Sequence, residues 1–125
     1  MKHSHLVLIG AFVLVASLPT QGAPPAAEPG KALLLGTDTA KARVLFRKID
    51  DGPVLWHFRH SLGTKLSVDP GHHNLNVLCH FNSPGVILSV VGNVEIDVEA
   101  GQIYDVAGDL ASDQQNCDVV FSKHQ

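Results

Sequence analysis

Residues 94–99 read Val-Glu-Ile-Asp-Val-Glu, and this strict alternation decides the fold class. Successive side chains of a β-strand point to opposite faces of the sheet, so a period of two predicts a strand with one buried face. The three apolar residues of the stretch are expected to face a core. The three carboxylates, Glu95, Asp97 and Glu99, are expected to face solvent on the other side.

The same period of two recurs on both sides of this stretch. It is found in residues 42–49, 54–60, 65–69, 73–81, 103–106 and 117–121. Residues 85–91 are uniformly apolar, and we expect them to form a strand that is buried on both sides. Gly92-Asn93, which follows directly, is typical of a hairpin turn. The pattern predicts an all-β fold, a single small antiparallel β-sandwich of about seven to eight strands, with a small barrel as the alternative.

The stretch at 54–60 carries a specific expectation about its buried face. Its apolar positions share one side of the strand, namely Val54, Trp56 and Phe58. His60 is in phase with them and is expected to be partly buried at the strand end. In the turn before this strand, Gly52 is expected to supply the unusual backbone angle.

The N-terminal region has the order of a secretory signal peptide. Lys2 gives a positive start, Leu6–Leu18 is an apolar run, and small residues follow it. The run is shorter than the roughly 20 residues of a membrane-spanning helix, so we expect residues 1–22 to be cleaved and to leave no transmembrane anchor. An uncleaved anchor or a buried helix is the alternative. Residues 23–32 are expected to form a flexible Pro/Ala-rich leader, and residues 33–125 the β-sandwich domain.

Cys79 and Cys117 are the two cysteines of the chain. An even number in an exported protein predicts a disulfide. Each cysteine is in phase with the apolar positions of its own alternating stretch, so both sulfurs are expected to point into the core, provided that no bulge shifts the phase. Such a bridge contributes up to about 4 kcal/mol in the chain-entropy treatment. Free thiols or a pair of metal ligands are the alternatives.

Two segments carry a family resemblance. Residues 66–77 read LSVDPGHHNLNV, and residues 98–106 read VEAGQIYDV. In each, a turn containing glycine leads into a strand, and in the second Tyr104 adds a large ring with a polar tip. Together they resemble small uncharacterised bacterial envelope proteins with a PEGA-like or transthyretin-like β-sandwich. The resemblance implies a non-catalytic envelope protein, but no cysteine near the expected cleavage site could carry a lipid anchor.

Histidine is the most notable excess in the composition. Of the eight histidines, six follow the predicted signal peptide. Imidazole is the commonest metal ligand, so a Zn or Cu site is one hypothesis. Its candidate ligands are His57, His72, His73 and His80. Adjacent residues diverge on a regular strand, and no spacing matches a zinc signature. We therefore favour scattered surface histidines and no cofactor.

The carboxylate row Glu95, Asp97 and Glu99 forms a possible interaction face. Such a row can bind Ca²⁺ or a basic partner. Alternatively, it is a solvated face that protects an edge strand from aggregation. The net charge of −3 argues against nucleic-acid binding.

The sequence holds no nucleophile elbow, phosphate loop or dinucleotide fingerprint. The cysteines are expected to be paired, which argues against a thiol nucleophile. We therefore expect a protein that is not an enzyme. The leading hypothesis is a periplasmic or secreted accessory or binding module whose partner is another envelope protein or a small ligand. The alternative is a periplasmic Zn- or Cu-binding protein that uses surface histidines.

Overall fold

The computed structural model describes residues 24–125, so the signal peptide predicted for residues 1–22 lies outside the described residues. The described part folds into nine β-strands without a helix. Their bounds are β1 (Ala32–Gly36), β2 (Ala42–Ile49), β3 (Trp56–Phe58), β4 (Ser61–Leu62), β5 (Lys65–Val68), β6 (Gly71–Ser83), β7 (Val86–Val98), β8 (Ile103–Leu110) and β9 (Cys117–Lys123). The all-β prediction is confirmed.

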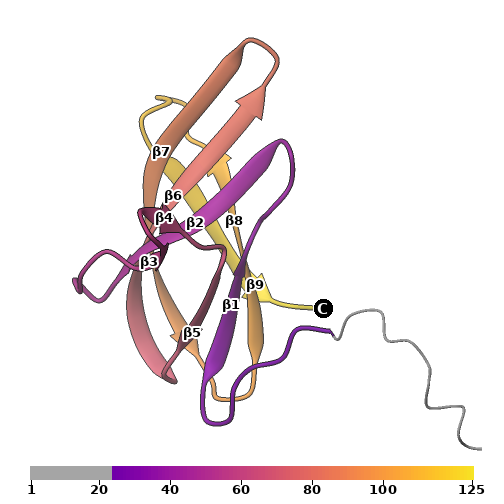
Figure 1. Cartoon of the computed structure of the whole chain (residues 1–125), viewed down its shortest axis with the longest axis vertical. Helices are drawn as coiled ribbons and strands as arrows, with labels where there is room; N and C mark the ends of the chain where they lie inside the picture. The colour runs from indigo at the N-terminus through magenta and orange to yellow at the C-terminus, as the bar shows by residue number, and fades with distance from the viewer. Residues whose placement is uncertain (1–23) are drawn as a thin grey trace, which may run out of the picture.

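Two main sheets pack against each other as a small β-sandwich (Figure 1). One has the strand order β5-β1-β8-β9 and the other β2-β6-β7, while β3 and β4 form a separate short hairpin. The strand pairs of the described chain are antiparallel except β1 with β8, which run parallel. No short turn joins β1 to β8, so hairpin geometry does not impose an antiparallel direction on this pair.

The core lies between the two sheets and follows the period of two. On β6 the buried residues are Leu75, Val77 and Cys79, and they face Leu34, Tyr104 and Val106 of the other sheet, among others. On β7, Ile96 and Val98 are buried. The carboxylates of residues 95, 97 and 99 are exposed, as the alternation predicts.

A β-bulge in β2 interrupts this period. The register with β6 skips Arg47, which lies between Phe46 and Lys48. The extra residue shifts the phase, so Phe46 and Ile49 both pack into the core although they are three positions apart. Arg47 stays outside, where its Nη1 donates to Asn76 Oδ1 at 2.8 Å.

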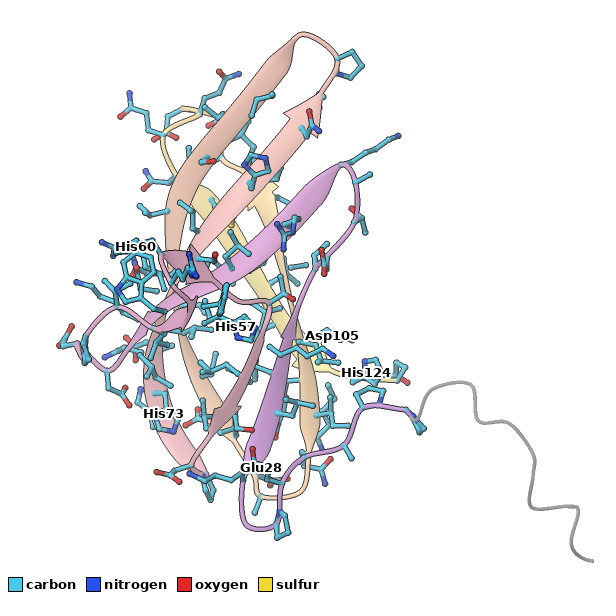
Figure 2. The ribbon with its side chains drawn as sticks, viewed as in Figure 1. Glu28, His57, His60, His73, Asp105 and His124 are labelled. Carbon is cyan, nitrogen blue, oxygen red and sulfur yellow. A yellow bond between two sulfur atoms is a disulfide. The ribbon has the colours of Figure 1, made fainter. Side chains whose placement is uncertain are left out.

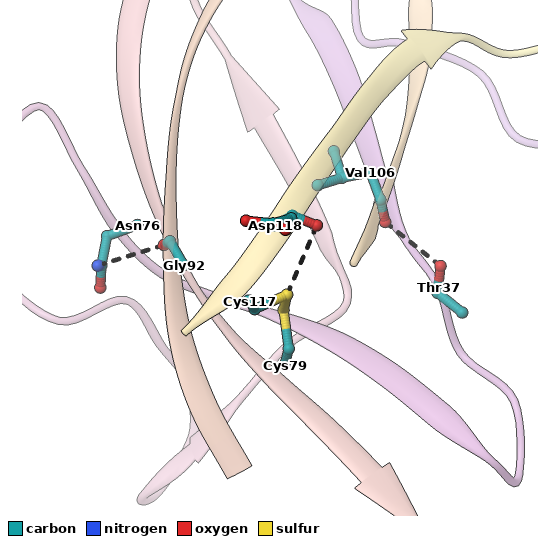
Figure 3. The surroundings of a disulfide bond; sticks show 7 residues. All are labelled: Thr37, Asn76, Cys79, Gly92, Val106, Cys117 and Asp118. Atoms are coloured by element: carbon teal, nitrogen blue, oxygen red, sulfur yellow. Dashed lines mark hydrogen bonds between the residues drawn. A yellow bond between two sulfur atoms is a disulfide. The ribbon is translucent and has the colours of Figure 1, made fainter. Parts of the chain in front are cut away.

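The predicted disulfide is present and joins the two sheets. Cys79 lies on β6 and Cys117 on β9, and their Cα atoms are 6.3 Å apart (Figure 3). Both residues are buried, which confirms that their shared phase directs both sulfurs into the core. Gly108 on β8 makes room for the bridge, because a Cβ there would lie 2.4 Å from Cys117 Sγ and 2.6 Å from Cys79 Sγ.

The prediction of a hairpin turn at Gly92-Asn93 is wrong. β7 runs unbroken through both residues, and the turn that precedes it is Pro84-Gly85. Gly92 is needed for close packing instead, since a Cβ there would lie 2.7 Å from the Cys117 carbonyl oxygen. Residues 85–91 are also not buried on both sides, because Ile87 and Val91 are exposed.

The prediction of a core strand at 54–60 is wrong as well. Only Trp56–Phe58 is strand, and it turns at Arg59, whose φ is +52°, into the two-residue β4. Trp56 and Phe58 are 53 % and 65 % exposed, and His60 is exposed rather than partly buried. The alternation shows which side chains share a side, but this hairpin lies outside the sandwich.

Candidate functional site

The outer face of the three-stranded sheet is crossed by the β3–β4 hairpin (Figure 1). Between them lies a groove with a volume of about 590 Å³. Its lining residues come from β2, β6, the hairpin and the segment before it, and are Arg43, Leu45, Arg47, Val54, Trp56, His60, Ser61, Leu62 and Leu78. The volume is within the roughly 300–1,000 Å³ of small-molecule sites.

The groove combines an apolar lining with two cations. Arg43 donates from Nε to Asp38 Oδ1 at 3.0 Å, and Arg47 donates to Asn76. A guanidinium has five N–H donors, so each of these bonds leaves several for a ligand. Among the described residues, no carboxylate lines the groove. The groove therefore offers apolar surface beside two guanidinium groups, of which that of Arg43 forms an ion pair with Asp38.

Trp56 forms one wall of the groove. Its ring packs edge-on against His60, with ring centroids 5.4 Å apart and planes at 88°. Figure 2 shows His57 and His60 on this part of the molecule. A half-exposed tryptophan beside arginines is a typical composition of binding surfaces. The sequence pattern missed this site because it assigned Trp56 to the core.

A second polar cluster occupies the start of β6, where His72 lies between two acids of β7. Its Nδ1 is 2.9 Å from Asp97 Oδ1, and its Nε2 is 3.0 Å from Glu95 Oε1. Both partners are acceptors, so both ring nitrogens carry hydrogen when both bonds form. The bonds to Asp97 and Glu95 accordingly raise the pKa of His72 above its ordinary value.

His73 has a similar pair of acceptors on the other side of the strand. Its Nδ1 is 2.5 Å from Asp50 Oδ2, and its Nε2 is 2.6 Å from the Asp69 carbonyl oxygen. Burial lowers the pKa of His73, but these bonds and the charge of Asp50 outweigh it, so the pKa is raised. The bond from His73, with the Asn74 N–H, lowers the pKa of Asp50.

Asp50 is placed for this contact by a strained turn. Asp50 and Asp51 have φ values of +50° and +59°, a region that non-glycine residues adopt rarely. The turn closes with a bond from Gly52 N–H to the Ile49 carbonyl at 2.9 Å. The two aspartates, and not Gly52 as predicted, therefore take the unusual backbone angle. The adjacent aspartates did signal a turn, but nothing in the sequence pointed to His73 as the partner.

The four candidate metal ligands do not converge. His72 and His73 point to different acceptors, His57 lies on the hairpin, and His80 bonds to Ser89 Oγ at 2.8 Å. His80 is about 23 Å along β6 from His73, at about 3.3 Å per residue. Within residues 24–125, no group of three or more His, Cys, Asp or Glu side chains could hold a metal ion. Metal binding stays a prediction without a preformed site to support it.

The candidate acidic face is divided between two partners. Glu95 and Asp97 bond to His72, whereas Glu99 lies 4.0 Å from Lys123 Nζ of β9. The C-terminal His124 makes a comparable contact, with Nδ1 2.9 Å from Asp105 Oδ1 (Figure 2). The carboxylates of this end are therefore largely engaged within the molecule.

Comparison with known proteins identifies no relative of this chain. The chain matches no protein-family model, no curated protein and no solved structure. The resemblance to PEGA-like and transthyretin-like proteins stays a prediction. The part of the chain that the structure describes has no helix able to cross a membrane.

Proposed function

We propose that the protein is an exported, non-catalytic binding module that holds a small anionic ligand with a flat apolar body. The observation that carries the proposal is the groove between the β3–β4 hairpin and the outer face of β2 and β6. Its apolar residues suit a flat hydrophobic group stacked beside Trp56. Arg43 and Arg47 suit a carboxylate or similar anion.

His72 and His73 support a binding role over a catalytic one. A general base needs a ring nitrogen with a free lone pair. In His72 and His73 both ring nitrogens face acceptor oxygens, which favours the charged form without such a lone pair. Cys79 and Cys117 are bonded to each other and offer no thiolate.

Export is supported by two independent features. The order of charge, apolar run and small residues over residues 1–22 is typical of a signal peptide. The disulfide fits an oxidising compartment, because intracellular thiols are generally kept reduced. We therefore propose that the module works in the periplasm or outside the cell.

Binding can be followed through Trp56, which is the single tryptophan of the chain. A ¹H–¹⁵N spectrum contains one indole resonance from it. We expect 2-naphthoate to shift this resonance in a saturable way and the neutral 2-naphthamide to bind about tenfold more weakly, since a bond to a charged group contributes about 1.5–3 kcal/mol. Equal binding of both probes would contradict the anionic ligand, and no shift with either would contradict the groove.

Two matched pairs of variants locate the site. Arg47→Met should weaken 2-naphthoate binding about tenfold. Arg59→Met, on the β3–β4 hairpin but outside the groove, should not. Calorimetry of Trp56→Ala should show lost binding. Phe58→Ala removes an exposed aromatic ring that does not line the groove and should leave binding intact. Equal effects within either pair would place the ligand elsewhere.

A further inference from the structure

β7 is the edge strand of the three-stranded sheet, and its two halves differ in chemistry. Exposed edges are usually protected by charged side chains. The half near the acidic row has this protection in Glu95 and Asp97. Residues 86–91, Val-Ile-Leu-Ser-Val-Val, have no charge. Ile87 and Val91 are large apolar side chains on this half, and they are 71 % and 38 % exposed.

The backbone groups at this edge follow from the hydrogen bonds of β6. Asn82 N–H donates toward β2, to the Lys41 carbonyl. Alternate residues of an antiparallel strand bond to opposite neighbours, so Ser83 bonds to β7, where its register partner is Val86. Every second residue after Val86 then bonds to β6. The residues between them, 87, 89 and 91, direct their N–H and C=O groups to the open edge.

We propose that two copies of this chain pair through the β7 edges, antiparallel, about a twofold axis at Ser89. In this register Ser89 lies opposite Ser89 of the second copy, and Ile87 lies opposite Val91. The residues whose backbone groups face the edge then pair with each other. The two three-stranded sheets become one continuous sheet.

The uncharged half of the edge is complementary to itself about an axis at Ser89. In an antiparallel pair of identical strands, the residue numbers of every opposed pair add up to the same constant. Setting Ile87 against Val91 therefore requires the twofold axis to pass at Ser89. This axis also separates like charges. Glu95 would lie opposite position 83 of the second copy, beyond the first residue of its β7, so the two acidic rows do not meet. These features favour a second copy over an unrelated partner.

The pairing leaves the groove of the proposed function open. The groove is lined from β2, β6 and the hairpin, and β7 contributes no residue to it. One short strand pair buries less than the standard interface of about 1,600 Å². We therefore expect a reversible dimer whose population rises with protein concentration.

Sedimentation equilibrium of the purified protein over a range of concentrations tests the association. We expect a monomer–dimer equilibrium that Ile87→Lys abolishes, since it opposes a charge to an apolar residue twice in each dimer. Val120→Lys is the matched control, because Val120 is an exposed apolar residue on β9. Urea unfolding and the intact Cys79–Cys117 bridge confirm that each variant is folded. A wild type that stays monomeric, or an equal effect of both variants, would overturn the proposal.

Cross-linking tests the register. In a hydrogen-bonded antiparallel pair the Cα atoms are about 5.5 Å apart, which suits a disulfide. Ser89→Cys should therefore form an intermolecular bridge under mild oxidation. Asn93→Cys should not, because position 93 would face position 85 of the second copy. Equal cross-linking of the two variants, or growth into species larger than a dimer, would contradict the pairing about Ser89.

Discussion

The two ends of β6 are held in place by different chemistry. Near Cys79 the strand is fixed to the other sheet by a buried covalent bond, and Gly108 and Gly92 leave no spare volume around it. Near His72 and His73 the same strand is held by hydrogen bonds between imidazoles and acceptor oxygens at the surface. One end depends on redox state and volume, and the other on protonation.

Each end of β6 is therefore sensitive to a different perturbation. At the Cys79 end, where packing is dry and close, one added side-chain carbon destabilises the fold. At the histidine end, loss of one proton from an imidazole removes a hydrogen bond, because the ring must donate from both nitrogens. Reduction, a small added side chain and a change of pH should therefore act on different ends of one strand.

The largest effect is expected from removing the bridge in Cys79→Ala/Cys117→Ala. The bridge spans 38 residues, so its loss should destabilise the protein by about 4 kcal/mol in the chain-entropy treatment. Urea unfolding measures this change as a lower midpoint. Wild-type protein reduced with dithiothreitol should unfold at a midpoint similar to that of the double variant. An unchanged midpoint in the double variant would show that the packing around the bridge suffices.

A smaller effect at the same end is expected from Gly108→Ala. The added Cβ would meet Cys117 Sγ at 2.4 Å and Cys79 Sγ at 2.6 Å, and overpacking of this kind costs about 1–3 kcal/mol. The matched control is the same substitution in the variant without both sulfurs. The nearest remaining atom there is the Cβ of residue 79, at 3.6 Å, an ordinary contact. A double-mutant cycle should show strong coupling, and additive effects would contradict the geometry.

The sequence predicted the Cys79 end better than the His73 end. The phase of Cys79 and Cys117 in their strands was enough to direct both sulfurs inward, since a period of two is a property of the chain itself. The contact of His73 with Asp50 depends on the register of β2 against β6, which the bulge at Arg47 shifts by one residue. No local pattern encodes that shift.

The groove beside Trp56 and the uncharged β7 edge could not be predicted from the sequence, for related reasons. Trp56 alternates like a core residue, but alternation does not say which layer a strand joins. From the sequence, Gly92 predicts a turn, because a glycine that turns the chain and a glycine that admits a neighbouring backbone look the same in a sequence. Once Gly92 lies within β7, the apolar residues before it extend that edge strand.

The smallest effect is expected from pH at the His73 end. The pKa of His73 is raised above 6.5, so its bonds stabilise the fold fully below that pH and are lost as pH rises through the raised pKa. The pKa of Asp50 is lowered below 3.8, so its contribution is present above that pH and is lost as pH falls through the lowered pKa. The pair stabilises most between these two ordinary values.

Urea midpoints at about pH 5.5 and about pH 8.5 compare the two sides of this window. The decrease on going to alkaline pH should be smaller in His73→Gln than in wild type, because glutamine cannot lose a proton. His57→Gln, on the exposed hairpin, should keep the full decrease, and so should Cys79→Ala/Cys117→Ala. If His73→Gln also kept the full decrease, protonation of His73 would not stabilise the fold.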